Sequence, residues 1–162
     1  MRAGRWRKPA LAGDSPLRYS LAHAGNRAAL AVAWERDVGI DLEAVDLELD
    51  LPPLMAVACA PAEAARLETL PVAERVEAFL TLWTLKEAYL KATGAGLSQD
   101  PRTIAVELLP NGRAAVRDTD PKSAHQRWSL SRLDAGPGWV AALAIDGADQ
   151  AVREFHWLPR HR

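Results

Sequence analysis

The stretch that decides the fold is VAERVEAFLTLWTLKEAYLKAT, residues Val72 to Thr93. Its apolar residues recur three, four and seven positions apart, which is the spacing of one face of an α-helix. The stripe that they form consists of Val72, Val76, Phe79, Leu80, Trp83 and Leu90. Gly94 and Gly96 follow, and glycine is common where helices end. We therefore predict a long helix over residues 72–93.

Strand patterns flank this helix on both sides. In VGIDLE, residues Val38 to Glu43, apolar residues alternate with small or acidic ones, which is typical of a half-buried strand. The apolar run from Ala28 to Trp34 is close enough to pair with it as a hairpin. Pro52-Pro53 is expected to break the chain before a short helix near residues 62–70. Later strands are predicted over 103–109, 113–117, 128–133 and 139–145, which gives an α+β fold with an antiparallel sheet packed on one long helix.

The composition places few limits on function. The chain has 162 residues, 49% hydrophobic and 25% charged, and fits one domain or two small lobes sharing a core. A net charge of −1 gives no reason to expect a nucleic-acid partner. No run approaches the roughly 20 apolar residues of a membrane span. The single cysteine, Cys59, favours a reducing cytoplasm.

Two carboxylates lie on the predicted strand at Val38–Glu43. Asp41 and Glu43 are two residues apart, so they point to the same face, about 6.5 Å apart along the strand. Carboxylates this close repel each other, and a cation between them would relieve that repulsion. A solvent-exposed acidic face is the alternative interpretation of this pair alone.

A third carboxylate lies on the predicted helix. One turn beyond Trp83 the apolar stripe reaches Glu87, and one more turn reaches Lys91. The alternative is an ordinary Glu87–Lys91 helix pair. Acidic oxygens from two elements suit a hard cation such as Mg²⁺ rather than zinc. We therefore predict that Asp41, Glu43 and Glu87 hold one divalent cation, Mg²⁺ or Mn²⁺, in a group-transfer enzyme that acts at a phosphate.

These residues also carry a family resemblance. WTLKEAYLK, residues Trp83 to Lys91, closely resembles the W-[ST]-x-K-E-A-x-x-K signature of the 4′-phosphopantetheinyl transferases of the surfactin-synthetase-activator type. VGIDLE resembles the other signature of that family, V-G-[IV]-D-[IL]-E. Their order agrees with the family, and so does the Gly94-Ala95-Gly96-Leu97 that follows. The resemblance is close over about residues 4 to 100 and extends to the later strands only in pattern.

The resemblance implies a 4′-phosphopantetheinyl transferase-like fold and a reaction. Such enzymes transfer the phosphopantetheine arm of coenzyme A to a serine hydroxyl of an acyl- or peptidyl-carrier protein and release adenosine 3′,5′-bisphosphate. By analogy, Asp41, Glu43 and Glu87 are the metal ligands. Glu87, directly or through a metal-bound water, is the candidate base for the serine. Lys91 is expected to stabilise charge on the phosphates, and Lys86 is a weaker candidate for the same task.

The resemblance also implies an organisation for the N-terminal part. Residues 1–27 are predicted to be an arm with coenzyme A contacts, and residues 28–162 the catalytic domain. Lys8 and His23 would hold the nucleotide end of coenzyme A, although a surface or packing histidine is the alternative for His23. Where the family has Ser-His-Ser, this chain has Ala22-His23-Ala24, which removes two hydroxyls that could bond to the ligand.

Relatives of this type have two similar halves with coenzyme A between them, and we expect this chain to lack most of the first half. Self-association could supply the missing wall, as in the short trimeric relatives of the family. Alternatively, Arg2, Arg5 and Arg7 replace the lost contacts, or the chain is a truncated product with little activity. A carrier-protein or coenzyme A-binding module without catalysis stays open as a second function, and a generic Mg²⁺-dependent phosphate-ester enzyme as a third. The sequence does not identify the carrier protein or its pathway.

Overall fold

The computed structural model describes residues 11, 14–118, 127–148 and 151–157. Within these residues a five-stranded antiparallel sheet has the order β3-β7-β6-β5-β4, and β1 and β2 form a separate antiparallel hairpin. The strands are β1 Leu17–Ala24, β2 Arg27–Trp34, β3 Val38–Ala44, β4 Ile104–Leu108, β5 Arg113–Asp118, β6 Trp128–Leu133 and β7 Trp139–Asp146. The α-helices are α1 Leu51–Ala58, α2 Pro61–Thr69 and α3 Val72–Thr93, and short 3₁₀ helices span Gly96–Ser98 and Pro101–Thr103.

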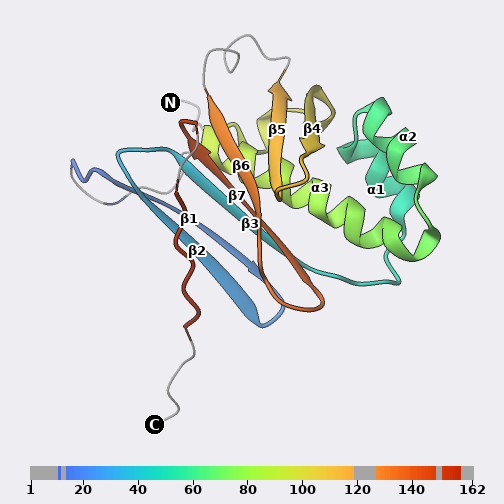
Figure 1. Ribbon diagram of the computed structural model, residues 1–162. Coiled ribbons are helices and arrows are strands. Elements are labelled where there is room, and N and C mark those ends of the chain that lie inside the picture. Colours follow the sequence, from blue (N-terminus) through green and yellow to red (C-terminus); the bar gives the residue numbers. More distant parts are fainter. Residues whose placement is uncertain (1–10, 12–13, 119–126, 149–150, 158–162) are drawn as a thin grey trace, which may run out of the picture.

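The elements form three layers. Helix α3 runs along one face of the large sheet, and the β1–β2 hairpin covers the other face where β3 and β7 lie (Figure 1). Helices α1 and α2 pack beside α3, near β4. The α+β prediction with an antiparallel sheet on one long helix is therefore confirmed.

Helix α3 has the predicted bounds. It ends at Gly94, whose φ of 72° is the left-handed conformation that glycine adopts without strain. Val76 and Phe79 are buried as the stripe requires, whereas Val72 lies at the helix start and is exposed. From residue 79 onward the helix is buried on most of its circumference, because it packs against both the sheet and the smaller helices.

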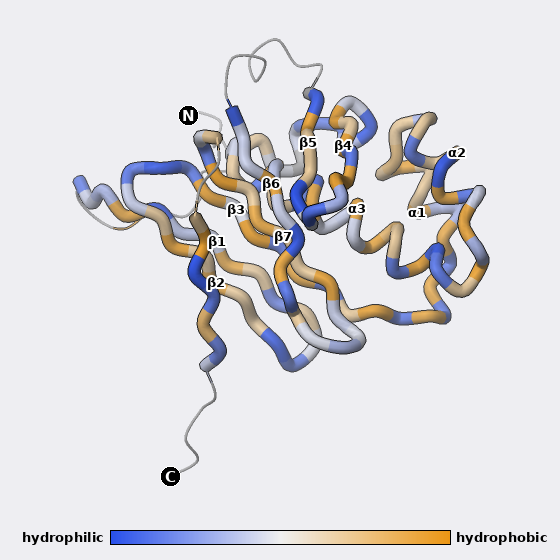
Figure 2. The backbone as a smooth tube through the Cα atoms, viewed as in Figure 1, coloured by the Kyte–Doolittle hydropathy of each residue, from blue (hydrophilic) through white to orange (hydrophobic). Residues whose placement is uncertain are grey.

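Strand β3 differs from the prediction in its partner. It pairs with β7 near the end of the chain, with Val38 opposite Ile145 and Ala44 opposite Trp139, and not with residues 28–34. Nor is β3 half-buried. Ile40 packs toward the hairpin, and Gly39 lies against α3, so both faces are covered. Figure 2 shows hydrophobic residues concentrated along β3 and β7, as two-sided burial demands.

The partner of β2 is β1, a strand that the sequence analysis did not predict. The predicted boundary between residues 27 and 28 falls inside this hairpin, where paired strands leave no separate arm over residues 17–27. The inner face carries small side chains, among them Ala22 and Ala31, which pack on the large sheet. The outer face is apolar and exposed at Leu21, Leu30, Val32 and Trp34.

Pro52-Pro53 starts a helix where a break was predicted. Both prolines lie in the first turn of α1, a position at which the missing N–H groups would have no partner within the helix. Helix α2 matches the predicted short helix to within a residue. The later strands match their predicted ranges closely, and Pro110-Asn111-Gly112 forms the turn between β4 and β5.

A buried ion pair joins α2 to α3. The Lys86 ammonium is fully buried and donates to Glu63 Oε2 at 2.5 Å, to the Ala58 carbonyl at 2.8 Å and to the Pro101 carbonyl at 3.0 Å. Glu63 in turn accepts from the backbone N–H groups of Ala60 and Val106. This network links α1, α2, α3 and β4, and each member has the partners that buried charges require.

Replacing Lys86 by Met should strongly destabilise the fold, because the Glu63 carboxylate would stay buried without its counter-charge. We expect the free energy of unfolding to fall by about 3–5 kcal/mol, measured by urea denaturation at neutral pH. Asp100→Asn, which removes an exposed ion pair with Arg102, is the control and should have a far smaller effect. Equal effects of the two changes would contradict a structural role for Lys86.

Candidate active site

The candidate active site lies where β3 faces α3. Asp41 and Glu43 share the face of β3 that carries Gly39, and Gly39 contacts the helix. Asp41 is 6% exposed. Its Oδ1 accepts a hydrogen bond from Lys91 Nζ at 2.6 Å, and the same ammonium donates to the Ile40 carbonyl at 3.2 Å. Asp41 Oδ2 is buried and has no hydrogen-bond partner among the described residues.

Glu43 and Glu87 complete the acidic group. The Trp83 side chain lies near Glu43 and lowers the pKa of that carboxyl, and Trp83, Glu87 and Lys91 follow one another at one-turn intervals on α3. Because Lys91 contacts Asp41 and Trp83 contacts Glu43, the helix and the strand run in opposite directions. Glu87 therefore lies on the helix between the two contacts that α3 makes with the acidic residues of β3.

Burial and mutual repulsion act together on these carboxylates. Burial is the main cause that raises the pKa of Asp41, of Glu43 and of Glu87 above their ordinary values. The charge of Asp41 raises the pKa of Glu43 and of Glu87 further, whereas the Lys91 ammonium opposes the rise in all three. When all three carboxyl groups are ionised they carry three negative charges, and the Lys91 ammonium supplies one positive charge. A further cation would therefore lower the repulsion among them.

The donor set fits a hard divalent cation, although the described residues form no preformed ligand cage. No three His, Cys, Asp or Glu side chains in the described part of the chain are arranged closely enough to hold a metal ion. The orphaned Asp41 Oδ2 is nevertheless an oxygen that lacks a donor in a buried position. Asp41, Glu43 and Glu87 offer only carboxylate oxygens, which are the ligands that Mg²⁺ and Mn²⁺ prefer.

The other predicted site residues lie elsewhere. Lys86 was a candidate for binding phosphates, but its ammonium is fully buried in the Glu63 network and faces away from the carboxylates. These contacts give Lys86 a structural role in this fold, and its contact with phosphates stays a prediction. His23 is exposed on the outer face of the hairpin beside Leu21, not on the face toward β3. Lys8 lies outside the described residues.

Ala22 was expected to mark a lost ligand contact, and the structure gives it another setting. It is 4% exposed and packs in the core between the hairpin and the large sheet. Ala24 packs against the same cluster. A serine at position 22 would bury its hydroxyl in this apolar layer, so the alanine suits the packing of the hairpin.

Trp83 is a site residue that the sequence analysis assigned only to the core. It lowers the pKa of Glu43, so it interacts with a candidate ligand as well as packing. The signal that could have found it is the regular one-turn spacing of Trp83, Glu87 and Lys91, because side chains four apart share a helix face.

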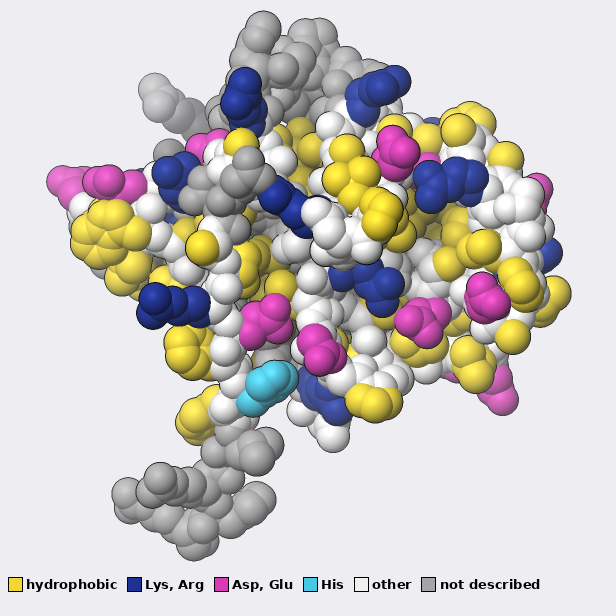
Figure 3. Space-filling view, in the orientation of Figure 1, with side chains coloured by type: hydrophobic (Ala, Val, Ile, Leu, Met, Phe, Trp, Pro, Cys, Tyr) yellow, Lys and Arg dark blue, Asp and Glu magenta, His cyan; other side chains and the backbone are white. Residues whose placement is uncertain are grey.

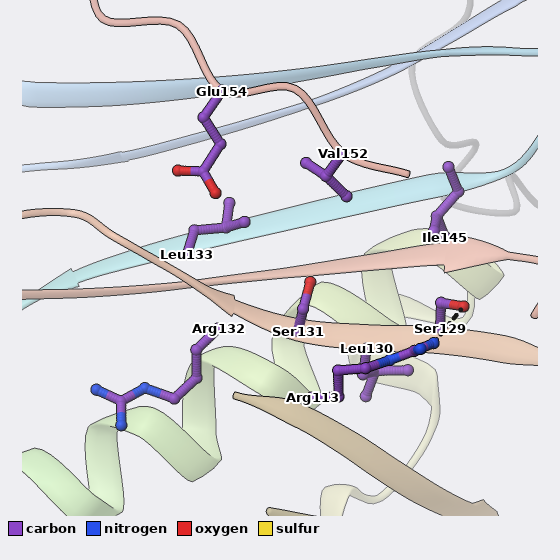
Figure 4. A pocket seen from close by; sticks show the side chains of 9 residues that line it. All are labelled: Arg113, Ser129, Leu130, Ser131, Arg132, Leu133, Ile145, Val152 and Glu154. Atoms are coloured by element: carbon purple, nitrogen blue, oxygen red, sulfur yellow. Dashed lines mark hydrogen bonds between the residues drawn. The ribbon is translucent and has the colours of Figure 1, made fainter. Parts of the chain in front are cut away.

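A cavity of about 260 Å³ lies away from this group, on the opposite face of the sheet between β5–β7 and the C-terminal segment (Figure 4). Its lining includes Arg113, Ser129, Val152 and Glu154 and none of the three carboxylates. The Arg132 side chain in this view extends toward α3, where it lies 3.7 Å from Glu77. The cavity therefore adds nothing to the candidate active site.

Two global features bear on possible partners. Basic and acidic side chains are intermixed on the face seen in Figure 3, so that face has no continuous basic surface for nucleic acid. Among the described residues, no helix has the length and apolar character needed to cross a bilayer.

Comparison with known proteins gives a consistent result. A family model described as the 4′-phosphopantetheinyl transferase superfamily matches residues 37–144. The 4′-phosphopantetheinyl transferase HetI of Nostoc sp. is 36% identical over 91% of this chain and 56% of its own length. The 4′-phosphopantetheinyl transferase AcpT of Escherichia coli is 31% identical over 59% of this chain and 49% of its own. The chain thus spans about half the length of these relatives.

Solved structures share the fold. The holo-[acyl-carrier-protein] synthase of Neisseria meningitidis superposes with a TM-score of 0.58 at 18% identity, over 68% of this chain and 97% of that one. The holo-(acyl-carrier-protein) synthase of Bacillus anthracis, in complex with CoA (3′,5′-ADP), gives a TM-score of 0.55 at 21% identity, over 68% and 94% of the two chains. At such identities the likeness concerns the fold alone.

Glu87→Gln should stabilise the metal-free protein at neutral pH. The raised pKa of Glu87 means that its ionised form is disfavoured in the folded state, so ionisation costs stability above both pKa values. Below the unfolded value of about 4.3, the carboxyl is protonated in both states and the cost disappears. In chelator-containing buffer we expect the Tm to rise by a few degrees at pH 7.5 and the gain to vanish by about pH 4.

Thermal denaturation followed by circular dichroism between pH 4 and 8 measures this difference. Glu77→Gln is the matched control, because Glu77 is exposed on the same helix. It should show no comparable gain at pH 7.5. An unchanged or lower Tm for Glu87→Gln at pH 7.5 would show that the charge of Glu87 is not held at a cost.

Proposed function

Because the chain belongs to the 4′-phosphopantetheinyl transferase superfamily, we propose that it transfers the 4′-phosphopantetheine arm of coenzyme A to a carrier-protein serine. The serine oxygen forms a new bond to the phosphorus that carries the arm. The pyrophosphate bond of coenzyme A breaks, and adenosine 3′,5′-bisphosphate leaves. The observation that carries the proposal is that the two signature segments, on β3 and α3, face each other and bring their acidic residues together with Lys91.

Coenzyme A as a substrate is supported by the neighbours. The Bacillus anthracis synthase with this fold is in complex with CoA, and the relatives similar in sequence are named 4′-phosphopantetheinyl transferases. An acyl- or peptidyl-carrier protein is therefore the proposed partner. Its pathway is not specified by any residue of this site.

We assign Asp41, Glu43 and Glu87 as the residues that would hold a divalent cation, Mg²⁺ or Mn²⁺. Such an ion, when bound, neutralises charge on the pyrophosphate and stabilises the leaving phosphate. Asp41 offers the buried Oδ2 that lacks a partner among the described residues, and Glu43 lies near Trp83.

Glu87 is the proposed general base. Its carboxylate lies close enough to Asp41 and Glu43 to interact with their charges, which places it at the same interface to accept the serine proton. Lys91 is the proposed phosphate-contacting residue, because its ammonium is about one-third exposed while it also neutralises Asp41. Lys8 and His23 remain proposed contacts for the nucleotide end, and His23 is open to solvent as such a contact requires.

The wall of the coenzyme pocket opposite this site is proposed to come from a second copy of the chain. The support is the outer face of the β1–β2 hairpin, where the exposed apolar side chains of Leu21, Leu30, Val32 and Trp34 offer a surface that a second copy would cover. The reaction is proposed to take place in the cytoplasm. A free thiol such as that of Cys59 stays reduced in that compartment.

A catalytically weak carrier-protein or coenzyme A-binding module is the second candidate. The alanines at positions 22 and 24, where the family has serines, favour it. The two candidates differ in one product. The enzyme adds a phosphopantetheine arm to a carrier serine, whereas the module binds its ligands and leaves the carrier mass unchanged.

The deciding experiment mixes the protein with coenzyme A, Mg²⁺ and a panel of unmodified acyl- and peptidyl-carrier proteins, and measures the intact mass of each carrier. The transferase adds one arm to at least one carrier and releases adenosine 3′,5′-bisphosphate. No mass gain on any carrier, with coenzyme A still bound in calorimetry, would favour the binding module. Light scattering on the same sample tests self-association.

Glu87→Ala should lower the rate of arm transfer about 10²–10⁴-fold, because general-base catalysis contributes on that order. The loss should appear in kcat. Glu77→Ala, an exposed change on the same helix, should keep the wild-type rate. A Glu87→Ala protein with full activity would mean that the base and the metal site are misassigned.

A further inference from the structure

Gly39 makes the closest contact between β3 and α3. A Cβ atom at this position would lie 1.9 Å from the Ala88 carbonyl oxygen and 2.5 Å from the Ala92 nitrogen. Both neighbours are helix backbone atoms, so no side chain can rotate out of the way. The backbone of Gly39 does not have a positive φ. Glycine is therefore required here for space and not for conformation.

The helix also has small residues at this contact. Ala88 is 0% exposed and Ala92 is 1% exposed, and the two residues lie one turn apart on the face of α3 toward the strand. The hydrogen atom that Gly39 carries in place of a side chain lets the strand backbone approach the helix backbone at these two small residues. Any larger side chain at this point would hold β3 and α3 apart.

The acidic site lies directly beside this contact. Asp41 follows Gly39 on the same face of β3, and Lys91 precedes Ala92 on α3. The Lys91 ammonium crosses the gap to Asp41 Oδ1 at 2.6 Å and to the Ile40 carbonyl at 3.2 Å. Glu87 precedes Ala88 in the same way. The separation of the strand carboxylates from Glu87 thus depends on how closely the backbones approach at Gly39.

We infer that Gly39 is a positioning residue for the cation site, which it serves by fixing the spacing between β3 and α3. This inference rests on the proposed function, because it concerns the same cation. It goes beyond that function by assigning a role in metal affinity to a residue without a side chain. Asp41, Glu43 and Glu87 supply the oxygens, and the contact of Gly39 with Ala88 and Ala92 sets the distance between them.

The test is the affinity of the metal alone for Gly39→Ala, measured by electron paramagnetic resonance of free Mn²⁺ with no coenzyme or carrier present. We expect the dissociation constant to rise about 10–100-fold, the usual loss when the support of a metal ligand is removed. Near-ultraviolet circular dichroism well below the Tm establishes that the variant is folded. Asp41→Asn serves as the variant that loses binding directly.

Leu130→Ala is the matched control for lost stability. Leu130 is 1% exposed on β6 in the core shared with α3, and β6 is separated from β3 by β7. This variant should melt at a lower temperature and keep its Mn²⁺ affinity within about twofold of the wild type, since no metal ligand or its support is touched. If Gly39→Ala does not fold, Ala88→Ser enlarges a fully buried helix residue whose backbone meets Gly39 and should weaken Mn²⁺ binding in the same direction.

The outcomes separate the inference from the proposed function. Folded Gly39→Ala, or Ala88→Ser in its place, with wild-type Mn²⁺ affinity overturns the positioning role while the cation site stands. Equal losses in Leu130→Ala and Gly39→Ala also overturn it, because they would reflect stability alone. A wild-type protein that binds no Mn²⁺ overturns the cation site itself and the positioning role with it.

Discussion

Strand β3 and helix α3 touch through their backbones, with a hydrogen atom at Gly39 on one side and backbone atoms of Ala88 and Ala92 on the other. Most helices pack on a sheet about 10 Å away through interdigitated side chains, whereas here the side chains at the centre of the contact are almost absent. Further layers pack on both sides of this contact. The hairpin closes the outer face of β3, and the large sheet spreads along α3 from β7 to β4.

This close contact buries acidic residues that would otherwise lie in water. A strand buried on both faces would ordinarily carry only apolar side chains, yet Asp41 lies within it at 6% exposure. Lys91 compensates part of its charge, and the raised pKa values of Glu43 and Glu87 show that compensation is incomplete. Natural proteins keep such local conflicts mainly where function needs them. The second buried pair, Lys86 with Glu63, shows the contrast, because every member of that network is satisfied.

The sequence predicted the elements better than their partners. Helix α3 and the later strands were found because periodicity and turn residues are local signals. The pairing of β3 with β7 could not be found in this way, since it joins segments from opposite ends of the chain. The prolines of α1 were misinterpreted because proline disrupts a helix interior but suits its first turn. Strand β1 was missed because its inner residues are small, which weakens the alternation of hydrophobicity.

For the candidate active site, too, the sequence predicted the arrangement within each segment better than the surroundings of each residue. Spacing within each segment placed Asp41 with Glu43 and Glu87 with Lys91, and the structure brings these two pairs to one interface. The role of Lys86 was not readable, because its neighbour Glu87 faces the strand while Lys86 itself turns about 100° around the helix toward α2. Which of two adjacent charged residues enters the core depends on the layers around the helix, and a single-helix pattern does not contain that information.

The pairing of β3 with β7 also determines when the site can assemble during synthesis. Asp41 leaves the ribosome roughly 100 residues before Ala142, the residue opposite it on the strand that holds it in place. Until then β3 lacks its only ladder partner within the described residues, and the carboxylates have no fixed surface to face. A nascent chain that stops before β7 therefore carries every residue of the candidate active site without the framework that orders them.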